Sequence, residues 1–158
     1  MHETRDLGPA VPFPPPLVYV IGVGGAQLLQ RVVPLPLWIP DTRLVTIGGA
    51  ALAVLGLGLM FTGILTFRRF RTAVYPNRPA KVLVDTGVYA HTRNPMYAGM
   101  TTAYLGGVLL TGSMWMVVLL PIVLLVIRTQ VIAREERHLT TQFPEAYTAY
   151  CARVRRWV

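Results

Sequence analysis

The chain has 158 residues, of which 53% are hydrophobic and only 14% are charged, and its mean hydropathy is +0.49. Soluble domains carry roughly a quarter charged residues, so this composition excludes an ordinary water-soluble domain and indicates a membrane protein. A net charge of +8 would also suit nucleic-acid binding, so the positions of the charges must decide. The length predicts one domain. The single cysteine, Cys151, excludes an internal disulfide framework, and the three histidines lie too far apart to predict a metal site.

Two apolar stretches in the first half of the chain predict membrane helices. A span needs about 20 apolar residues. The first stretch, Leu17 to Leu29, reaches that length only if residues up to Val33 are included. The second, Leu44 to Phe67, has 24 residues without a charge and lies between arginines, so we expect it to cross the membrane.

A third apolar stretch, Met96 to Val126, is uncharged over 31 residues, which is too long for one span. The Thr111-Gly112-Ser113 sequence within it suits a tight turn, so we expect a hairpin of two helices at about 95–111 and 114–133. Pro121 predicts a kink in the second helix. We expect that helix to leave the bilayer early and to continue on the cytoplasmic side.

The basic residues indicate how the chain is oriented. Twelve of the fifteen lie in the segment between the second and third spans or from Arg128 onward, past the apolar core of the fourth. Because short cytoplasmic segments are rich in Lys and Arg, both termini and the middle segment are predicted to be cytoplasmic, and no nucleic-acid partner is needed to explain the charge. We therefore predict an all-α polytopic domain with about four transmembrane helices. Its parts are a tail (1–16), two membrane helices (17–67), a cytoplasmic loop (68–94), the helical hairpin (95–133) and an interfacial tail (134–158).

Small residues are spaced for close helix contact. Gly22 and Ala26, and Gly49 and Ala53, are four residues apart, and further glycines follow at positions 56, 58 and 63. The alternative is that glycine is simply common in membrane helices. No ionisable side chain lies within an apolar core, which argues against an ion-coupled transporter.

The first polar segment at the predicted cytoplasmic face runs from Asp85 to Gly99 and leads into the third span. Asn94 suits the N-cap of a helix and Pro95 its first position. The free amides of this helix start, flanked by Arg93, favour an anion.

The second polar segment, Arg134 to Arg137, contains the pair Glu135-Glu136. Apolar and aromatic residues then recur every three or four positions, and Pro144 divides this region into two helices. We expect the second helix to lie in the interface with its aromatic side toward lipid. Anchoring does not explain the two carboxylates. An anion site beside a carboxylate pair suits a small zwitterion such as S-adenosylmethionine, although charge alone does not name it.

These residues resemble a known family. The stretch from Arg78 to Gly99, with Leu83 to Tyr89 followed by Thr-Arg-Asn-Pro-Met-Tyr-Ala-Gly at 92–99, resembles the isoprenylcysteine carboxyl methyltransferases. The later Glu135-Glu136, the aromatic positions after it and Arg156-Trp157 match the C-terminal pattern of that family. The same residues are similar to phosphatidylethanolamine N-methyltransferases, which share Asn-Pro-Met-Tyr-x-Gly, Tyr-Leu-Gly and Glu-Glu. Asn94 stands where many of the carboxyl methyltransferases have His.

Both resemblances imply an S-adenosylmethionine-dependent methyltransferase that acts by direct displacement on a lipophilic acceptor from the membrane. Carboxyl O-methylation of a prenylcysteine-like substrate is favoured, and N-methylation of a phospholipid ethanolamine headgroup is the alternative. A non-enzymatic membrane transporter or assembly protein is the third possibility.

The resemblance also implies roles for individual residues. Arg93 and the free amides at the start of the third span, next to Asn94 and Pro95, would bind the cofactor carboxylate, and Glu135 and Glu136 its ammonium or ribose hydroxyls. Tyr89 and Tyr97 would stack on adenine or contact the sulfonium.

Other roles concern the edges of the site. His91 would line the nucleotide site or be an exposed loop residue, and Gly99 would allow close helix approach. A carboxylate acceptor needs an orienting cation, for which Arg153 and Arg156 are the candidates. An amine acceptor must lose a proton, for which Glu136 is the candidate.

Overall fold

The computed structural model describes residues 8–9, 11–35, 37, 39–40, 42–72 and 80–157, and over these residues the secondary structure is helical, with no strand. Arg78 and Pro79 of the first motif lie outside the described residues. The all-α prediction is confirmed. The elements are α1 (Pro15–Val32), α2 (Arg43–Arg69), η1 (Gly87–Ala90), α3 (Pro95–Thr111), α4 (Met114–Val126), η2 (Ile127–Ile132), α5 (Ala133–Gln142) and α6 (Pro144–Arg153).

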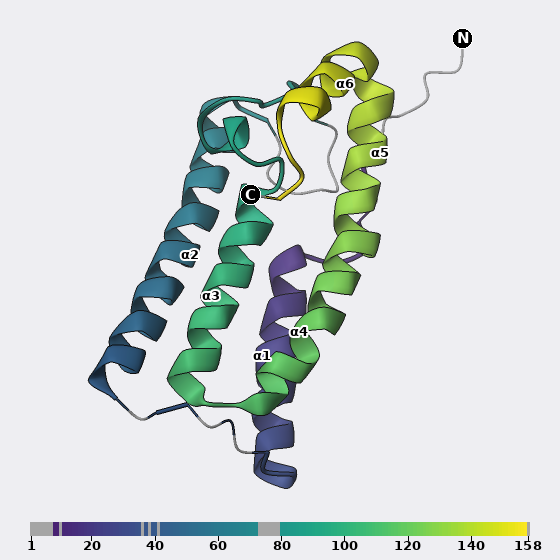
Figure 1. The fold of residues 1–158 in the computed structure, drawn as a ribbon. Helices are drawn as coiled ribbons and strands as arrows, with labels where there is room; N and C mark the ends of the chain where they lie inside the picture. Colours follow the sequence, from purple (N-terminus) through teal and green to yellow (C-terminus); the bar gives the residue numbers. More distant parts are fainter. Residues whose placement is uncertain are drawn as a thin grey trace.

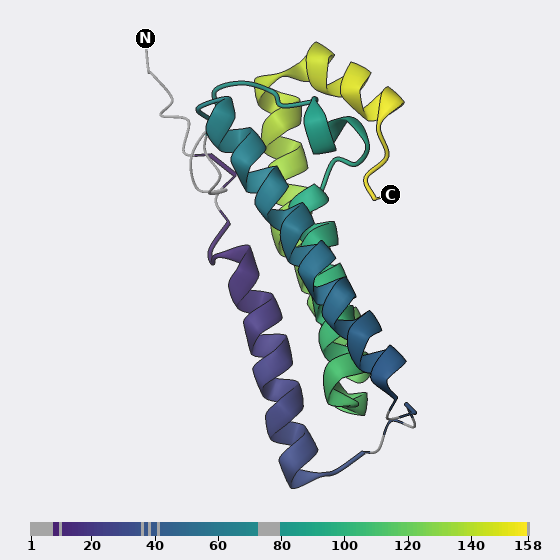
Figure 2. The same ribbon diagram turned by 90° about the vertical axis from the view of Figure 1, so that its left-hand side faces the viewer.

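The helices α1 to α4 run side by side with alternating direction, and α6 lies across one end of them (Figures 1 and 2). The end of α2, the start of α3 and the whole of α5 and α6 lie toward this end, which we call the α6 end, whereas α1 begins further down the bundle. The order matches the prediction that the middle segment and the tail share one side. That this side is cytoplasmic stays a prediction.

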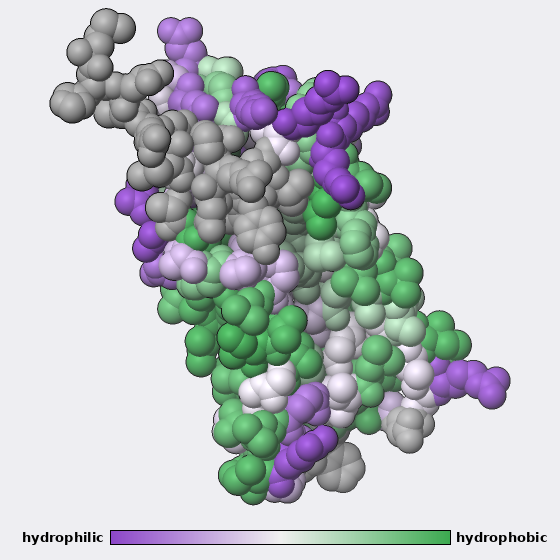
Figure 3. Space-filling view, turned by 180° about the vertical axis from the view of Figure 1, so that it is seen from behind, coloured by the Kyte–Doolittle hydropathy of each residue, from purple (hydrophilic) through white to green (hydrophobic). Residues whose placement is uncertain are grey.

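Among the residues that the structure describes, two helices are long and apolar enough to cross a membrane: α2, and the continuous helix Met114–Gln142 formed by α4, η2 and α5. The helices α1, with 18 residues, and α3, with 17, are shorter. Hydrophobic residues cover most of the middle of the face in Figure 3, and hydrophilic residues gather at its two ends. The exact number of spans stays a prediction.

The hairpin between α3 and α4 forms where the sequence predicts it. The helix α3 ends at Thr111, and Gly112 has a left-handed backbone with φ 60°, which a residue without a Cβ adopts readily. The irregularity in the second helix is the π-helical turn η2, which lies beyond Pro121. Its residues Ile127, Val131 and Ile132 are almost fully buried.

The helices α2 and α3 approach closely at glycines. A Cβ added to Gly99 would lie 2.5 Å from the Gly56 carbonyl oxygen, and one added to Gly106 would lie 2.6 Å from the Gly49 carbonyl oxygen. Real Cβ atoms do not approach backbone so closely, so larger residues here would separate the helices. Gly58, by contrast, faces open space. The predicted small-residue contact is therefore confirmed for Gly49 and does not extend to Gly58.

This contact gives a first test. Gly56→Ala should lower the stability of the detergent-solubilised protein by about 1–3 kcal/mol, because the new methyl group meets the backbone of α3. Gly58→Ala is the matched control and should leave it unchanged. Denaturant unfolding followed by fluorescence measures both, and equal effects of the two substitutions would contradict the packing described here.

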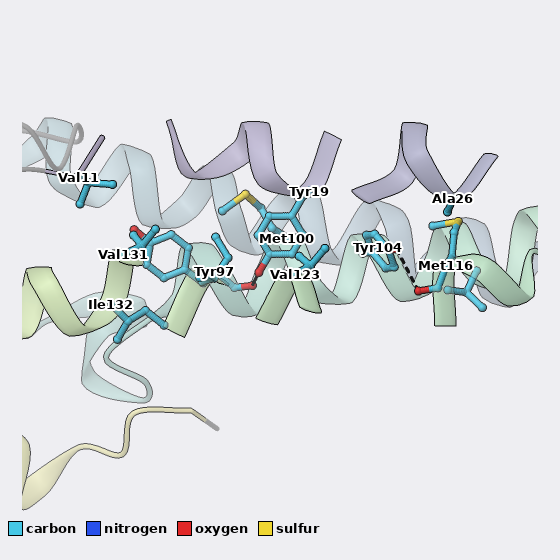
Figure 4. Close-up of a cluster of buried hydrophobic side chains, with 12 residues drawn as sticks. Val11, Tyr19, Ala26, Tyr97, Met100, Tyr104, Met116, Val123, Val131 and Ile132 are labelled. Carbon is cyan, nitrogen blue, oxygen red and sulfur yellow. Dashed lines mark hydrogen bonds between the residues drawn. The ribbon is translucent and has the colours of Figure 1, made fainter. Parts of the chain in front are cut away.

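Tyrosines join α1, α3 and α4 in the core shown in Figure 4. The Tyr19 hydroxyl donates to the Tyr97 carbonyl oxygen at 3.3 Å, and the Tyr104 hydroxyl donates to the Met116 carbonyl oxygen at 3.0 Å. Tyr97 is itself buried and belongs to the first turns of α3. The core therefore fixes the helix start on which the Asn-Pro-Met-Tyr sequence lies.

The helix α6 does not turn its aromatic side to lipid. Tyr147 and Tyr150 are buried and pack with Leu83, Leu139 and Phe143. The Tyr150 hydroxyl donates to the Tyr89 carbonyl oxygen at 2.7 Å. The lipid-facing orientation predicted for these two tyrosines is wrong, because the loop before α3 supplies an apolar surface and a hydrogen-bond acceptor that helical periodicity does not reveal.

Candidate active site

A cavity at the α6 end lies between the end of α2, the loop with η1, the start of α3, α5 and α6. Its empty volume is about 840 Å³, a figure that includes space open to solvent. Both sequence motifs contribute to its wall. The residues predicted for the site that line it are Tyr89, Arg93, Asn94, Pro95, Tyr97, Glu135 and Glu136.

Glu135 is held by α3 rather than by a cation. The Tyr97 hydroxyl donates to its Oε1 at 2.6 Å, which joins the first turn of α5 to the first turn of α3. Burial raises the pKa of this carboxyl to about 7, an effect that the Tyr97 hydrogen bond opposes and the charge of Glu136 reinforces. Glu135 follows Arg128 and Arg134 along the helix and so lies outside its apolar stretch. Because the hydrogen bond from Tyr97 is neutral, the carboxylate is a negative group in the cavity wall that no described cation neutralises.

Glu136, the next residue, is bound by arginines. Arg156 donates from Nε to Oε1 at 2.9 Å and from Nη2 to Oε2 at 2.7 Å. This bidentate geometry is the strong form of the Arg–carboxylate pair. Arg93 adds a further ion pair, with its Nη1 3.6 Å from Glu136 Oε1.

Arg93 is the cation that faces the cavity. Its Nη1 also donates to the Cys151 sulfur at 2.6 Å. Burial alone would lower the pKa of Arg93, but Cys151, Tyr147 and Glu136 raise it, and the net shift is upward, so the guanidinium stays charged. Its Nε is buried and has no hydrogen-bond partner among the described residues. One N–H of a permanent cation is thus left for a ligand.

Tyr89 offers a second unpaired group. Its ring stacks on Phe67 with centroids 4.9 Å apart, and both residues line the cavity. Its hydroxyl is buried and has no partner within the described part of the chain. Burial and the charge of Glu135 raise the pKa of this hydroxyl, so it stays protonated and can donate.

The last residues of the chain close one side of the site. The Arg93 amide donates to the Arg155 carbonyl oxygen at 3.0 Å, and the Thr92 hydroxyl and the Asn94 Nδ2 donate to that of Arg156 at 3.2 and 3.0 Å. Asn94 does stand at the N-cap of α3, with Pro95 next, as predicted. Its side chain makes no capping hydrogen bond, because it binds the C-terminal segment instead.

Three residues predicted for the site lie elsewhere. His91 is exposed on the loop and does not line the cavity. Gly99 faces Gly56 and serves helix packing. Arg153 is exposed and pairs with Asp85 at 3.2 Å.

A comparison with protein families matches the part of the chain that contains most of this site. A family model described as phospholipid methyltransferase matches residues 44–146, which is more than half of the chain. The chain belongs to the phospholipid methyltransferase family. No curated protein sequence and no solved structure matches it.

This family places the chain among membrane methyltransferases that act on lipids. It is the family of the phospholipid N-methylation alternative. The matched range covers the Asn94-Pro95 helix start and both carboxylates, and it ends just before Tyr147.

Sequence reasoning did not assign Tyr147 and Thr92 to the site. Tyr147 lines the cavity beside Arg93, and Thr92 is buried under the C-terminal segment. The signal for Tyr147 was its place in the aromatic series of the tail, which lipid anchoring explained equally well. The signal for Thr92 was only its position next to Arg93.

The Glu136–Arg156 pair should hold the C-terminal segment in place. Glu136→Gln removes the charge that Arg156 binds, and an interaction of about 1.5–3 kcal/mol with a charged group corresponds to at least about tenfold faster opening. Hydrogen exchange of the Arg93 amide, which donates to Arg155, should accelerate accordingly. Glu145→Gln, on α6, is the control. Unchanged exchange in the Glu136 variant would mean that the segment is held by other contacts.

Proposed function

We propose that the cavity binds S-adenosylmethionine and that the protein transfers its methyl group to the amine of a membrane phospholipid. The observation that carries this proposal is the pair of buried, unpartnered donors, Arg93 Nε and the Tyr89 hydroxyl, in one cavity with the Glu135 carboxylate. Family membership supports the same reaction class.

The residues present fit the cofactor. Its carboxylate suits the free N–H of Arg93, and its ammonium suits Glu135, which no cation among the described residues neutralises. Tyr89 donates a hydrogen bond toward the ribose or the adenine, and Phe67 beside it adds aromatic surface. Glu136 is paired with Arg156 and Arg93. It therefore positions these two arginines and is not free to take the ammonium.

When bound, S-adenosylmethionine supplies a methyl group activated by a sulfonium. The chain's own work is then to align the acceptor and to exclude water, which together can contribute several kcal/mol. The wall formed by α3, α5 and residues 155–157 serves both purposes, because hydrogen bonds and the Arg156 ion pair hold it against the loop. No covalent nucleophile is required, and Cys151 remains a neighbour of Arg93.

The charges favour an amine acceptor over a carboxylate. The two arginines predicted to orient a carboxylate are both occupied, because Arg156 is paired with Glu136 and Arg153 with Asp85. An incoming carboxylate would also meet Glu135. A phospholipid amine meets no such repulsion. Because two arginines already bind Glu136, we expect the proton of the amine to leave to water rather than to Glu136.

The cofactor proposal is tested by calorimetric binding of S-adenosylhomocysteine to the protein in detergent. Arg93→Gln should weaken binding at least about tenfold, because a charge-assisted hydrogen bond is lost. Arg137→Gln, an exposed arginine on α5, is the matched control and should bind normally. Equal affinities for the two variants would remove Arg93 from the site.

The pH dependence gives an independent test. Since the pKa of Glu135 is raised to about 7, its carboxylate is neutral below that pH and charged above it. Binding of the ammonium-bearing ligand should therefore strengthen as the pH rises from 6 to 8. Glu135→Gln should bind weakly and lose this dependence. A dependence that survives in the variant would have to come from another group.

The acceptor is tested by transfer of labelled methyl groups. Vesicles containing phosphatidylethanolamine should accept label, and a prenylcysteine analogue in the same vesicles should not. Labelling of the prenylcysteine analogue alone would establish carboxyl methylation and overturn the amine assignment. If neither is labelled while S-adenosylhomocysteine binds, the acceptor assignment fails and the cofactor site stands.

A further inference from the structure

A second hollow, which we call the lateral groove, lies between α3 and α4 and opens to the side of the molecule. Its α3 wall includes Ala98 and Thr102, and its α4 wall includes Pro121 and Leu125. Arg128 and Trp157 lie at its α6 end. We propose, building on the proposed function, that the lateral groove holds the acceptor phospholipid, with an acyl chain along α3 and α4 and the phosphate at Arg128.

The walls of the lateral groove suit a hydrocarbon chain. The Thr101 and Thr102 hydroxyls donate to carbonyl oxygens of their own helix, Tyr97 O and Ala98 O, both at 2.9 Å. Their polar groups are thus satisfied within α3. Leu125 on the opposite wall is 59% exposed. Apolar surface left open at membrane depth is therefore available to an acyl chain.

Arg128 supplies the charge that selects a phospholipid. It is exposed, and it makes no hydrogen bond or ion pair with any residue the structure describes, in contrast to Arg153 and Arg156. Guanidinium groups bind phosphate through paired N–H donors. The Trp157 indole beside it is of the type that sits at headgroup level. A free cation at the end of an apolar groove complements a lipid phosphate with its chain attached.

The lateral groove and the cofactor cavity share a wall. Tyr97 lines the cavity, and Ala98, the next residue of α3, lines the groove. In the same way Arg156 binds Glu136 of the cavity, while Trp157 lines the groove. The segment that holds Arg155 and Arg156 accordingly lies beside the start of α3 (Figure 1). A headgroup amine attached to a phosphate at Arg128 is thus placed next to the first turns of α3, which also line the cofactor cavity.

Trp157 allows binding in the lateral groove to be measured without methyl transfer. In the full chain with Trp38→Phe and Trp115→Phe, it is the remaining tryptophan. Dibromo-phosphatidylethanolamine in detergent micelles should quench its fluorescence at about tenfold lower concentration than dibromo-diacylglycerol, because only the phospholipid carries a phosphate for Arg128. Arg128→Gln should abolish this preference. Arg69→Gln, an exposed arginine at the end of α2, should retain it.

The outcomes separate this inference from the proposed function. Equal quenching by the two lipids in the parent, or a preference that survives Arg128→Gln, overturns the phosphate site. If the preference depends on Arg128 but no lipid is methylated, the groove stands and the proposed function fails. If phosphatidylethanolamine is methylated and Arg128→Gln leaves its KM unchanged, the groove is not the acceptor site.

Discussion

The bidentate pair between Glu136 and Arg156 anchors the C-terminal segment to the helix that carries both carboxylates of the site. One partner lies on the helix that continues α4, and the other lies in the last residues of the chain, whose carbonyl groups accept hydrogen bonds from residues 92–94. Because such a pair fixes both distance and orientation, it sets the position of Arg93 and of the wall beside the cavity. Glu135 is thereby left as the carboxylate available to a ligand.

The helices follow from the sequence because a bilayer permits few alternatives. Uncharged stretches of sufficient length must be helical there, so the second span expected at 44–67 is found at Arg43–Arg69, and 95–111 agrees with α3. The Thr-Gly-Ser turn and the break at Pro144 follow from local backbone chemistry. These features depend on composition and on single residues, which a sequence displays directly.

The division of roles within the site could not be predicted in the same way. Glu135 and Glu136 are adjacent, identical in type and about 100° apart around a helix, so only the tertiary structure decides which one meets Arg156 and which one meets Tyr97. The same holds for Tyr147 and Tyr150, whose periodicity suits a lipid-facing and a protein-facing helix equally. Arg153, His91 and Gly99 lie in the segments that the motifs indicated but do not line the cavity.

The π-helical turn η2 has a consequence for the rotation of everything beyond it. A π-helical turn accommodates an additional residue within a helix that otherwise keeps its axis, so α5 is turned relative to the face that α4 presents to α1. Ile127, Val131 and Ile132 fill the contact at this point. The angular phase of the two carboxylates is therefore set by the residue count in η2. A natural relative lacking one residue here would carry the same Glu-Glu motif on a different side of its helix.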